Sequence, residues 1–349
     1  MRIFPVKYII GCLILLLSLY YGFISMADIK KIDSVESIKL GSQTQWIYIT
    51  GNNTDNPILL VIHGGPGFAM LPLFHYNNKK LENKFTIINW DQRGAGRSYD
   101  PKLKKLTLEQ LVSDAHDLTT LLKSRFKQNK IFILGHSTGS IIAVLLVKRY
   151  PEDYYAYVGV GQVVNFAETE QLSYAFAYEE ALRTNNKKAI KELQKIGEPN
   201  EKGNYRSEYG YDVTEKWVEY FGGELHNHKS LDSVYDEIFE SSIYEHAHQQ
   251  LLKGYEFSQI LFDYGMRDFD AEKEASTIDV PVYLFSGKYD HDTTTVLTKR
   301  YFDILKAPIK NFIIFPHSAH FPFYEEPKLF NKEMLELVLP NAFMDEKIK

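Results

Sequence analysis

The chain has 349 residues, of which 44% are hydrophobic and 24% charged, a composition that predicts a folded globular protein and excludes general disorder. Its formal net charge of −5 is spread over interspersed acids and bases, so the sequence predicts no nucleic-acid partner. Cys12 is the single cysteine, which excludes an intrachain disulfide framework and a zinc site built on several thiolates.

The N-terminal part of the chain carries an uncharged, apolar run over residues 8–27, preceded by Arg2 and Lys7. This run is about as long as a membrane-spanning helix requires. Positive charge before the run favours an N-terminus on the cytoplasmic side of the membrane and an extracytoplasmic catalytic domain. We therefore expect residues 1–36 to form a membrane anchor or signal segment with a linker.

Two alternatives for this segment stay open. Ser25 and Ala27 provide the small residues of a signal-peptide cleavage site, so the protein is either membrane-anchored or secreted after cleavage near Ala27. A lipoprotein signal around Cys12 fits less well, because this cysteine lies near the start of the apolar run and not at its end.

From about residue 37, short apolar runs alternate with helical stretches. The runs typical of strands buried on both faces are residues 58–63, 85–91, 131–136, 157–164, 280–285 and 311–315. Between them, residues 107–126 form an amphipathic helical pattern that starts with a capping box of Thr107 and Gln110. This alternation predicts an α/β fold with a mostly parallel, doubly wound sheet.

The alternation stops over residues 165–277, which are rich in helix-forming residues, above all over 168–183 and 232–255. We interpret this stretch as a helical lid inserted between two parts of an α/β core, residues 37–164 and 278–349. In open α/β folds such a lid covers the carboxyl ends of the strands, where ligands bind.

A nucleophile motif follows one of the predicted strands. Residues 135–139 read Gly-His-Ser-Thr-Gly, directly after the run 131–134 and directly before a helical pattern. G-x-S-x-G in a strand-turn-helix setting is the nucleophile elbow of serine hydrolases. Ser137 is therefore the predicted nucleophile.

Two further catalytic groups follow in the order Asp, then His. Asp290 and His320 each come shortly after a predicted strand, so both are expected at the carboxyl edge of the sheet. A serine hydroxyl needs a base to take its proton, and the base needs a carboxylate to orient it and to stabilise its cation. Asp292 is the alternative to Asp290, and His317 is the alternative to His320.

A glycine-rich turn provides the predicted oxyanion hole. Residues 63–67 read His-Gly-Gly-Pro-Gly after the run 58–62. Such a turn lets backbone N–H groups approach a developing negative charge. We expect the N–H groups of Gly65 and Thr138 to be the donors, and His63 to stabilise the turn.

With these motifs the chain resembles the α/β-hydrolase branch that contains the prolyl aminopeptidases, also called proline iminopeptidases. The resemblance is carried by residues 56–67, by Trp-Asp-Gln-Arg-Gly-Ala-Gly-Arg-Ser at 90–98, by 135–139, and by the end of the chain at 318–320 and 325–327. It implies the α/β-hydrolase fold, the triad Ser137, Asp290 and His320, and an oxyanion hole at Gly65 and Thr138. Thr138 stands where those enzymes commonly have tryptophan, and Ala95 where many have cysteine.

The resemblance implies hydrolysis of the N-terminal residue of small peptides through an acyl-enzyme, with no metal and no organic cofactor. A carboxylic-ester hydrolase is the alternative enzyme, and a non-catalytic, membrane-tethered binding protein is the second alternative. Lid carboxylates hold the substrate's α-ammonium in prolyl aminopeptidases. The candidates for that role here are Glu168, Glu170, Glu179 and Glu180.

Overall fold

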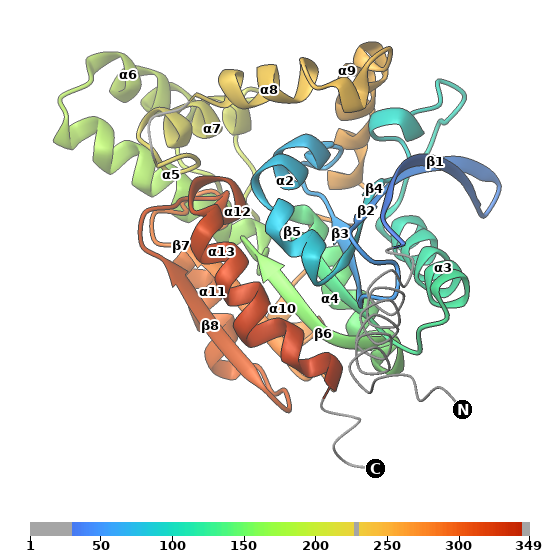
Figure 1. The fold of residues 1–349 in the computed structure, drawn as a ribbon. Helices are drawn as coiled ribbons and strands as arrows, with labels where there is room; N and C mark the ends of the chain where they lie inside the picture. The colour runs from blue at the N-terminus through green and yellow to red at the C-terminus, as the bar shows by residue number, and fades with distance from the viewer. Residues whose placement is uncertain (1–29, 227–229, 344–349) are drawn as a thin grey trace, which may run out of the picture.

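All eight strands of the computed structural model, which describes residues 30–226 and 230–343, belong to one sheet (Figure 1). Their order across the sheet is β1-β2-β4-β3-β5-β6-β7-β8. The bounds are β1 Ile32–Leu40, β2 Gln43–Gly51, β3 Ile58–Ile62, β4 Thr86–Asp91, β5 Ile131–His136, β6 Tyr154–Val160, β7 Val282–Gly287 and β8 Lys310–Phe315. The strands from β3 to β8 are parallel, and β1 and β2 add an antiparallel edge. The predicted α/β-hydrolase fold is thereby confirmed.

The hairpin of β1 and β2 was not expected from the sequence. Along β1 the side chains alternate between half-buried and exposed as far as Leu40, as befits an edge strand with one face in water. The pattern therefore lacks the continuous apolar run that marked the inner strands. β1 begins at Ile32, inside the segment 1–36 that the sequence assigned to anchor and linker.

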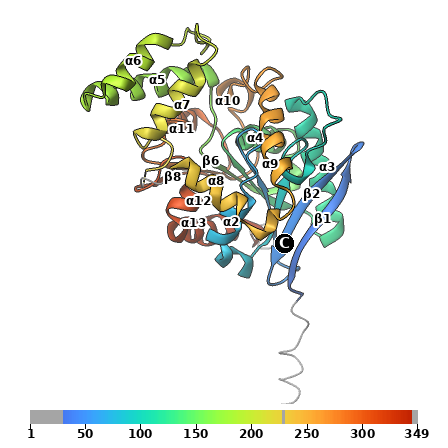
Figure 2. The same ribbon diagram turned by 90° about the horizontal axis from the view of Figure 1, so that it is seen from above.

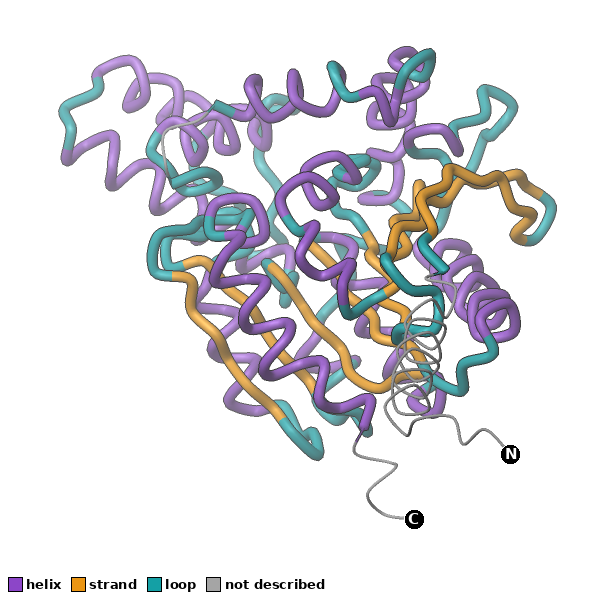
Figure 3. The backbone as a smooth tube through the Cα atoms, viewed as in Figure 1, coloured by secondary structure: helices purple, strands orange, loops and turns teal. Residues whose placement is uncertain are grey.

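Helices cover both faces of the sheet, as Figure 3 shows by colour. The helices that complete one hydrophobic cluster are α3 Leu108–Phe126, α4 Thr138–Arg149, α10 Ala271–Glu274 and α11 Thr295–Ile304. Those on the other face are α2 Leu71–Asn77, α12 Pro322–Glu325 and α13 Pro327–Glu333. Half of the predicted capping box of α3 is present: Thr107 Oγ1 accepts a hydrogen bond from the N–H of Gln110 at 3.2 Å, whereas the Gln110 side chain donates to Asp114 Oδ1 at 3.0 Å.

Further helices lie over the carboxyl ends of the strands and form a cap (Figures 1 and 2). They are α5 Phe166–Arg183, α6 Lys187–Ile196, α7 Gly210–Tyr220, α8 Leu231–Phe239 and α9 His248–Ser258. The helical stretch expected over 232–255 is two helices. The chain turns between them to bury Tyr244, whose hydroxyl donates a hydrogen bond to Asp91 Oδ1 at 2.5 Å.

The predicted membrane segment, residues 8–27, and Cys12 lie outside the described residues. Within 30–226 and 230–343, no helix is both long enough and apolar enough to cross a membrane.

A buried ion pair joins the end of β4 to helix α3. Arg93 donates from Nε to Asp114 Oδ2 at 2.5 Å and from Nη2 to Oδ1 at 2.8 Å, and the two side chains are 7% and 0% exposed. Gln43 accepts a further bond from Arg93 at 2.9 Å, and Gln45 donates to Asp114 at 2.7 Å. Buried charges are tolerated when they are paired and hydrogen-bonded. The arginine of the 90–98 motif thus ties the edge hairpin and α3 to the sheet.

Replacing Arg93 by Met should lower the free energy of unfolding by about 3 to 5 kcal/mol, because Asp114 would stay buried without its counter-ion. Urea denaturation measures this loss. The matched control is Arg125→Met, which removes a half-exposed pair with Glu36 at 2.6 Å and should cost about 1 kcal/mol or less. Equal losses in the two variants would show that the buried pair is not a major source of stability.

Candidate active site

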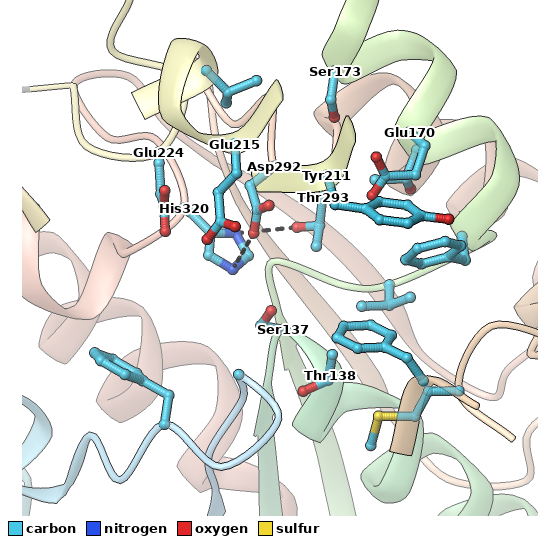
Figure 4. Close-up of a pocket in the computed structure, with 18 of the residues that line it drawn as sticks. Ser137, Thr138, Glu170, Ser173, Tyr211, Glu215, Glu224, Asp292, Thr293 and His320 are labelled. Carbon is cyan, nitrogen blue, oxygen red and sulfur yellow. Dashed lines mark hydrogen bonds and ion pairs between the residues drawn. The ribbon is translucent and has the colours of Figure 1, made fainter. Parts of the chain in front are cut away.

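Ser137 occupies a strained turn between β5 and α4. Its φ of 52° and ψ of −130° lie outside the regions that non-glycine residues ordinarily adopt. The turn packs very closely on the end of β3. A Cβ atom at Gly139 would lie 2.4 Å from the carbonyl oxygens of Ile62 and His63. This close packing holds the Ser137 side chain so that it faces the pocket (Figure 4).

The glycine turn after β3 lies directly beside the nucleophile. A Cβ atom at Gly64 would be 2.5 Å from the Cβ of Ser137, and Gly65 has a φ of 115° that favours glycine. Gly65 and Thr138 line the same pocket as Ser137. Thr138 is the first residue of α4, where N–H groups have no partner within the helix. Both predicted oxyanion donors are therefore close to the nucleophile.

His63 is engaged with the backbone of this turn. Its Nδ1–H donates to the carbonyl oxygen of Gly64 at 3.0 Å, and its Nε2 accepts from the N–H of Gln92 at 3.4 Å. Burial lowers the pKa of His63 to about 4, so the ring is neutral. The geometry agrees with the expected turn-stabilising role.

Asp290 and His320 meet at the carboxyl edge of the sheet, after β7 and β8. His320 Nδ1 lies 3.0 Å from Asp290 Oδ2, and the N–H of Thr293 donates to Asp290 Oδ1 at 2.8 Å. Burial raises the pKa of Asp290, but His320 and Thr293 outweigh it and hold that pKa below its ordinary value. His317, the alternative base, is exposed to solvent. The structure thus pairs the two residues that the sequence favoured.

Asp292 approaches the same imidazole from its other side. Its Oδ2 lies 3.0 Å from Nε2 of His320, as Figure 4 shows. The sequence treated Asp292 as an alternative to Asp290, whereas the structure places both carboxylates on one ring. Burial lowers the pKa of His320, but the charges of Asp290 and Asp292 outweigh burial and raise it to about 9.

Carboxylates near the end of the chain hold the His320 loop. Glu325 Oε2 accepts the N–H of Ala319 at 2.7 Å, and Glu326 Oε2 accepts the hydroxyl of Ser318 at 2.8 Å. These bonds explain the Glu-Glu-Pro at 325–327, which the sequence offered only as part of a resemblance.

The pocket above Ser137 has a volume of about 400 Å³ and is strongly acidic. Its walls include Glu170 from α5, Glu215 from α7, Glu224 from the segment after α7, and Asp292 (Figure 4). Among the described residues that line it, Arg267 is the only lysine or arginine.

The acidic side chains of the pocket differ in exposure: Glu224 is buried, Glu170 and Asp292 are half-buried, and Glu215 is exposed. Desolvation and then repulsion from Asp292 raise the pKa of Glu170 to about 8 and that of Glu215 to about 7. The same two causes raise the pKa of Glu224 well above its ordinary value, and desolvation raises that of Asp292. A cation in this pocket would stabilise the ionised form of these carboxylates.

Of the lid carboxylates suggested by the sequence, Glu170 lines the pocket. Glu168 pairs with Arg300 at 2.6 Å, Glu180 pairs with Arg183, and Glu179 is exposed. These three do not belong to the pocket.

The sequence analysis did not identify Glu215 and Glu224 as pocket residues. On α7, Glu215 shares a stripe with Tyr211, Thr214 and Val218, and all four face the pocket. Residues three and four apart share one face of a helix, so this spacing could have placed Glu215 on the same face as Tyr211. No comparable signal marks Glu224, which lies outside any helix or strand.

The segment after α7 and helix α5 are bonded to the loops of the candidate triad. The carbonyl oxygen of Glu224 accepts the N–H of His320 at 2.9 Å, and that of Gly223 accepts the N–H of His291 at 2.9 Å. Ser173 donates to the carbonyl oxygen of His291 at 2.6 Å. The segment that carries Glu224 and the helix that carries Glu170 are therefore held against the loops of His320 and Asp290.

Comparison with known proteins agrees with this site. The family model described as serine aminopeptidase, S33, matches residues 80–327. A Bacillus subtilis protein named "Probable aminopeptidase YbaC" is 31% identical over 308 residues, covering 86% of this chain and 95% of the relative. A proline iminopeptidase of Thermoplasma volcanium is 23% identical over 286 residues, covering 81% and 89% of the two chains.

Solved structures show the same fold. The crystal structure of a proline iminopeptidase from Mycobacterium smegmatis superposes with a TM-score of 0.63 at 16% identity, covering 88% of this chain and 98% of that one. From the family match and the Bacillus relative, the chain is a serine hydrolase of the α/β-hydrolase fold and belongs to the serine aminopeptidase family S33.

Proposed function

We propose that this enzyme is an aminopeptidase that removes the N-terminal residue of short peptides through an acyl-enzyme, with Ser137, His320 and Asp290 as its triad. The observation that carries the proposal is the group of acidic side chains around Ser137: Glu170, Glu215, Glu224 and Asp292. The names of its relatives, aminopeptidase and proline iminopeptidase, support it.

The acidic side chains fit the one charge that every unblocked peptide carries at its N-terminus. Transfer of an α-ammonium from water into a closed pocket is costly unless carboxylates pair with it. Glu224 Oε2 is buried and has no hydrogen-bond partner among the described residues. An ammonium would satisfy this oxygen and would lower the pKa values that desolvation and repulsion raise.

The remaining groups supply the steps of acyl transfer. The Ser137 hydroxyl attacks the carbonyl carbon of the first residue, His320 takes its proton, and the oxyanion accepts bonds from the N–H groups of Gly65 and Thr138. His320 then protonates the leaving amine, which departs as the shortened peptide. Water hydrolyses the acyl-enzyme by the same route and releases the free amino acid.

Ester hydrolysis is the second candidate, because the same groups would cleave a carboxylic ester. Apolar side chains also line the pocket, among them Val163, Phe166, Phe262 and Met266. An ester substrate would leave the acidic walls without a cation. Membership of a serine hydrolase family argues against the third interpretation, a non-catalytic binding protein.

Replacing Ser137 by Ala should lower turnover of an aminoacyl arylamide about a thousandfold or more, because the members of a triad act as a unit. The thermal unfolding transition should stay within a few degrees of the wild type, since Ala keeps the Cβ and removes one hydroxyl. More than about a tenth of wild-type activity in the folded variant would remove Ser137 from the mechanism.

The wild type should prefer an aminoacyl arylamide with a free amine over its N-acetylated form. Glu215→Gln and Glu170→Gln should each lower kcat/KM for the free amine about 30- to 5,000-fold, which corresponds to roughly 2 to 5 kcal/mol. The reason is that each substitution removes a charged partner of the ammonium. The acetylated arylamide should respond weakly.

Glu179→Gln is the matched control, because Glu179 lies on the exposed side of α5 and should leave both rates unchanged. Equal turnover of free and acetylated arylamides by the wild type would overturn the aminopeptidase proposal and favour the esterase.

A further inference from the structure

The contact between Asp292 and His320 conflicts with the geometry that catalysis needs. A general base must face the proton that it takes, so Nε2 of His320 has to bond to the Ser137 hydroxyl. In the structure, Nε2 lies 3.0 Å from Asp292 Oδ2, while Nδ1 is occupied by Asp290. An imidazole held by a carboxylate at each nitrogen is stabilised as its cation. That cation cannot accept a proton from Ser137.

The charges around Asp292 explain why it contacts His320. It faces the cap carboxylates Glu170, Glu215 and Glu224, each of which repels it. His320 is the cation that Asp292 contacts. The Asp292 side chain is 39% exposed, and Asp292 lines the pocket. Asp292 can therefore be reached by a ligand.

The other titratable groups beside His320 do not compete for Nε2. His136 has its ring centroid 4.7 Å away, but burial lowers its pKa and keeps it neutral, and its Nε2 bonds to the carbonyl oxygen of His320. Glu325 is held by the backbone N–H groups of Ala319 and His226.

We propose that Asp292 is a positioning residue that makes the catalytic base responsive to the substrate's amino group. In the free enzyme its carboxylate occupies Nε2 of His320. An α-ammonium that enters among the acidic side chains pairs with Asp292 and draws it away from His320. This inference rests on the proposed aminopeptidase function, and it adds that the amine activates the enzyme as well as binding to it.

The proton balance is simple. With Asp292 paired to the ammonium, His320 keeps one carboxylate partner, Asp290, and its second proton becomes more acidic. The Nε2 proton passes to solvent and takes one positive charge out of the site. The bound ammonium replaces that charge. Neutral His320, still oriented by Asp290 at Nδ1, then takes the Ser137 proton. A substrate without an amine leaves Nε2 occupied and meets a protonated base.

The first test needs no peptide. The rate at which a small alkyl fluorophosphonate labels Ser137 is measured against pH, because this probe has no amine and requires the base. In the wild type the rate should rise up to a pH of about 9, following the pKa of His320. In Asp292→Asn the rise should shift toward the ordinary histidine value of about 6.5, and labelling at pH 7 should increase about tenfold or more.

Asp279→Asn is the matched control, since Asp279 is an exposed aspartate just before β7. It should keep the wild-type pH profile. Circular dichroism confirms folding of each variant. If folded Asp292→Asn gives the wild-type pH profile and rate, the proposal is overturned.

The second test supplies the amine separately. Propylammonium at millimolar concentration should accelerate fluorophosphonate labelling of the wild type several-fold at pH 7 and should not accelerate labelling of Asp292→Asn. Labelling that slows or stays constant in the wild type would overturn activation by an amine. Neither result depends on peptide turnover, so a failure here is distinct from a failure of the free-amine preference that tests the aminopeptidase proposal.

Discussion

The site depends on one steric constraint, the close approach of the turn after β5 to the end of β3. No side chain fits at Gly139, where a Cβ would lie 2.4 Å from two carbonyl oxygens, or at Gly64, where it would meet the Cβ of Ser137 at 2.5 Å. The nucleophile, the start of α4 and the oxyanion turn are consequently packed as one unit. Two parallel strands paired in register, Ile62 opposite Gly135, set the position of that unit. The strained backbone of Ser137 is tolerated because both neighbours hold it.

Charged side chains are paired in the core, whereas acidic side chains are grouped together in the pocket. In the core, Arg93 and Asp114 are buried, but each has its counter-ion and further hydrogen-bond partners. In the pocket, Glu170, Glu215 and Glu224 line a shared space, where desolvation and then the charge of Asp292 raise the cost of ionising each of them. The buried ion pair stabilises the folded state, and the grouped carboxylates destabilise it. Costs of this kind are expected where a site is prepared for a ligand.

The sequence predicted the parts of the structure whose signal is local. Parallel strands buried on both faces leave continuous apolar runs, and motifs such as that around Ser137 combine turn and chemistry in five residues. The edge strand β1, with one face in water, leaves no such run. Glu224 lacks a motif because its position follows from backbone bonds to the His320 loop. The position of Asp292 was equally hidden, since two residues of separation from Asp290 do not reveal that the turn places both carboxylates on one ring.

The bonds between cap and core bear on how specificity is encoded. One fold can host many functions, because function lies in the site built on the fold. Here the carbonyl oxygen of Glu224 holds the backbone of His320, while its side chain lines the pocket. Ser173 and Gly223 likewise bond to His291, which lies between Asp290 and Asp292. Changes in this part of the cap should therefore alter the position of His320 as well as the pocket lining. If the pocket binds an amine as proposed, these short, direct bonds would link its recognition to the orientation of His320.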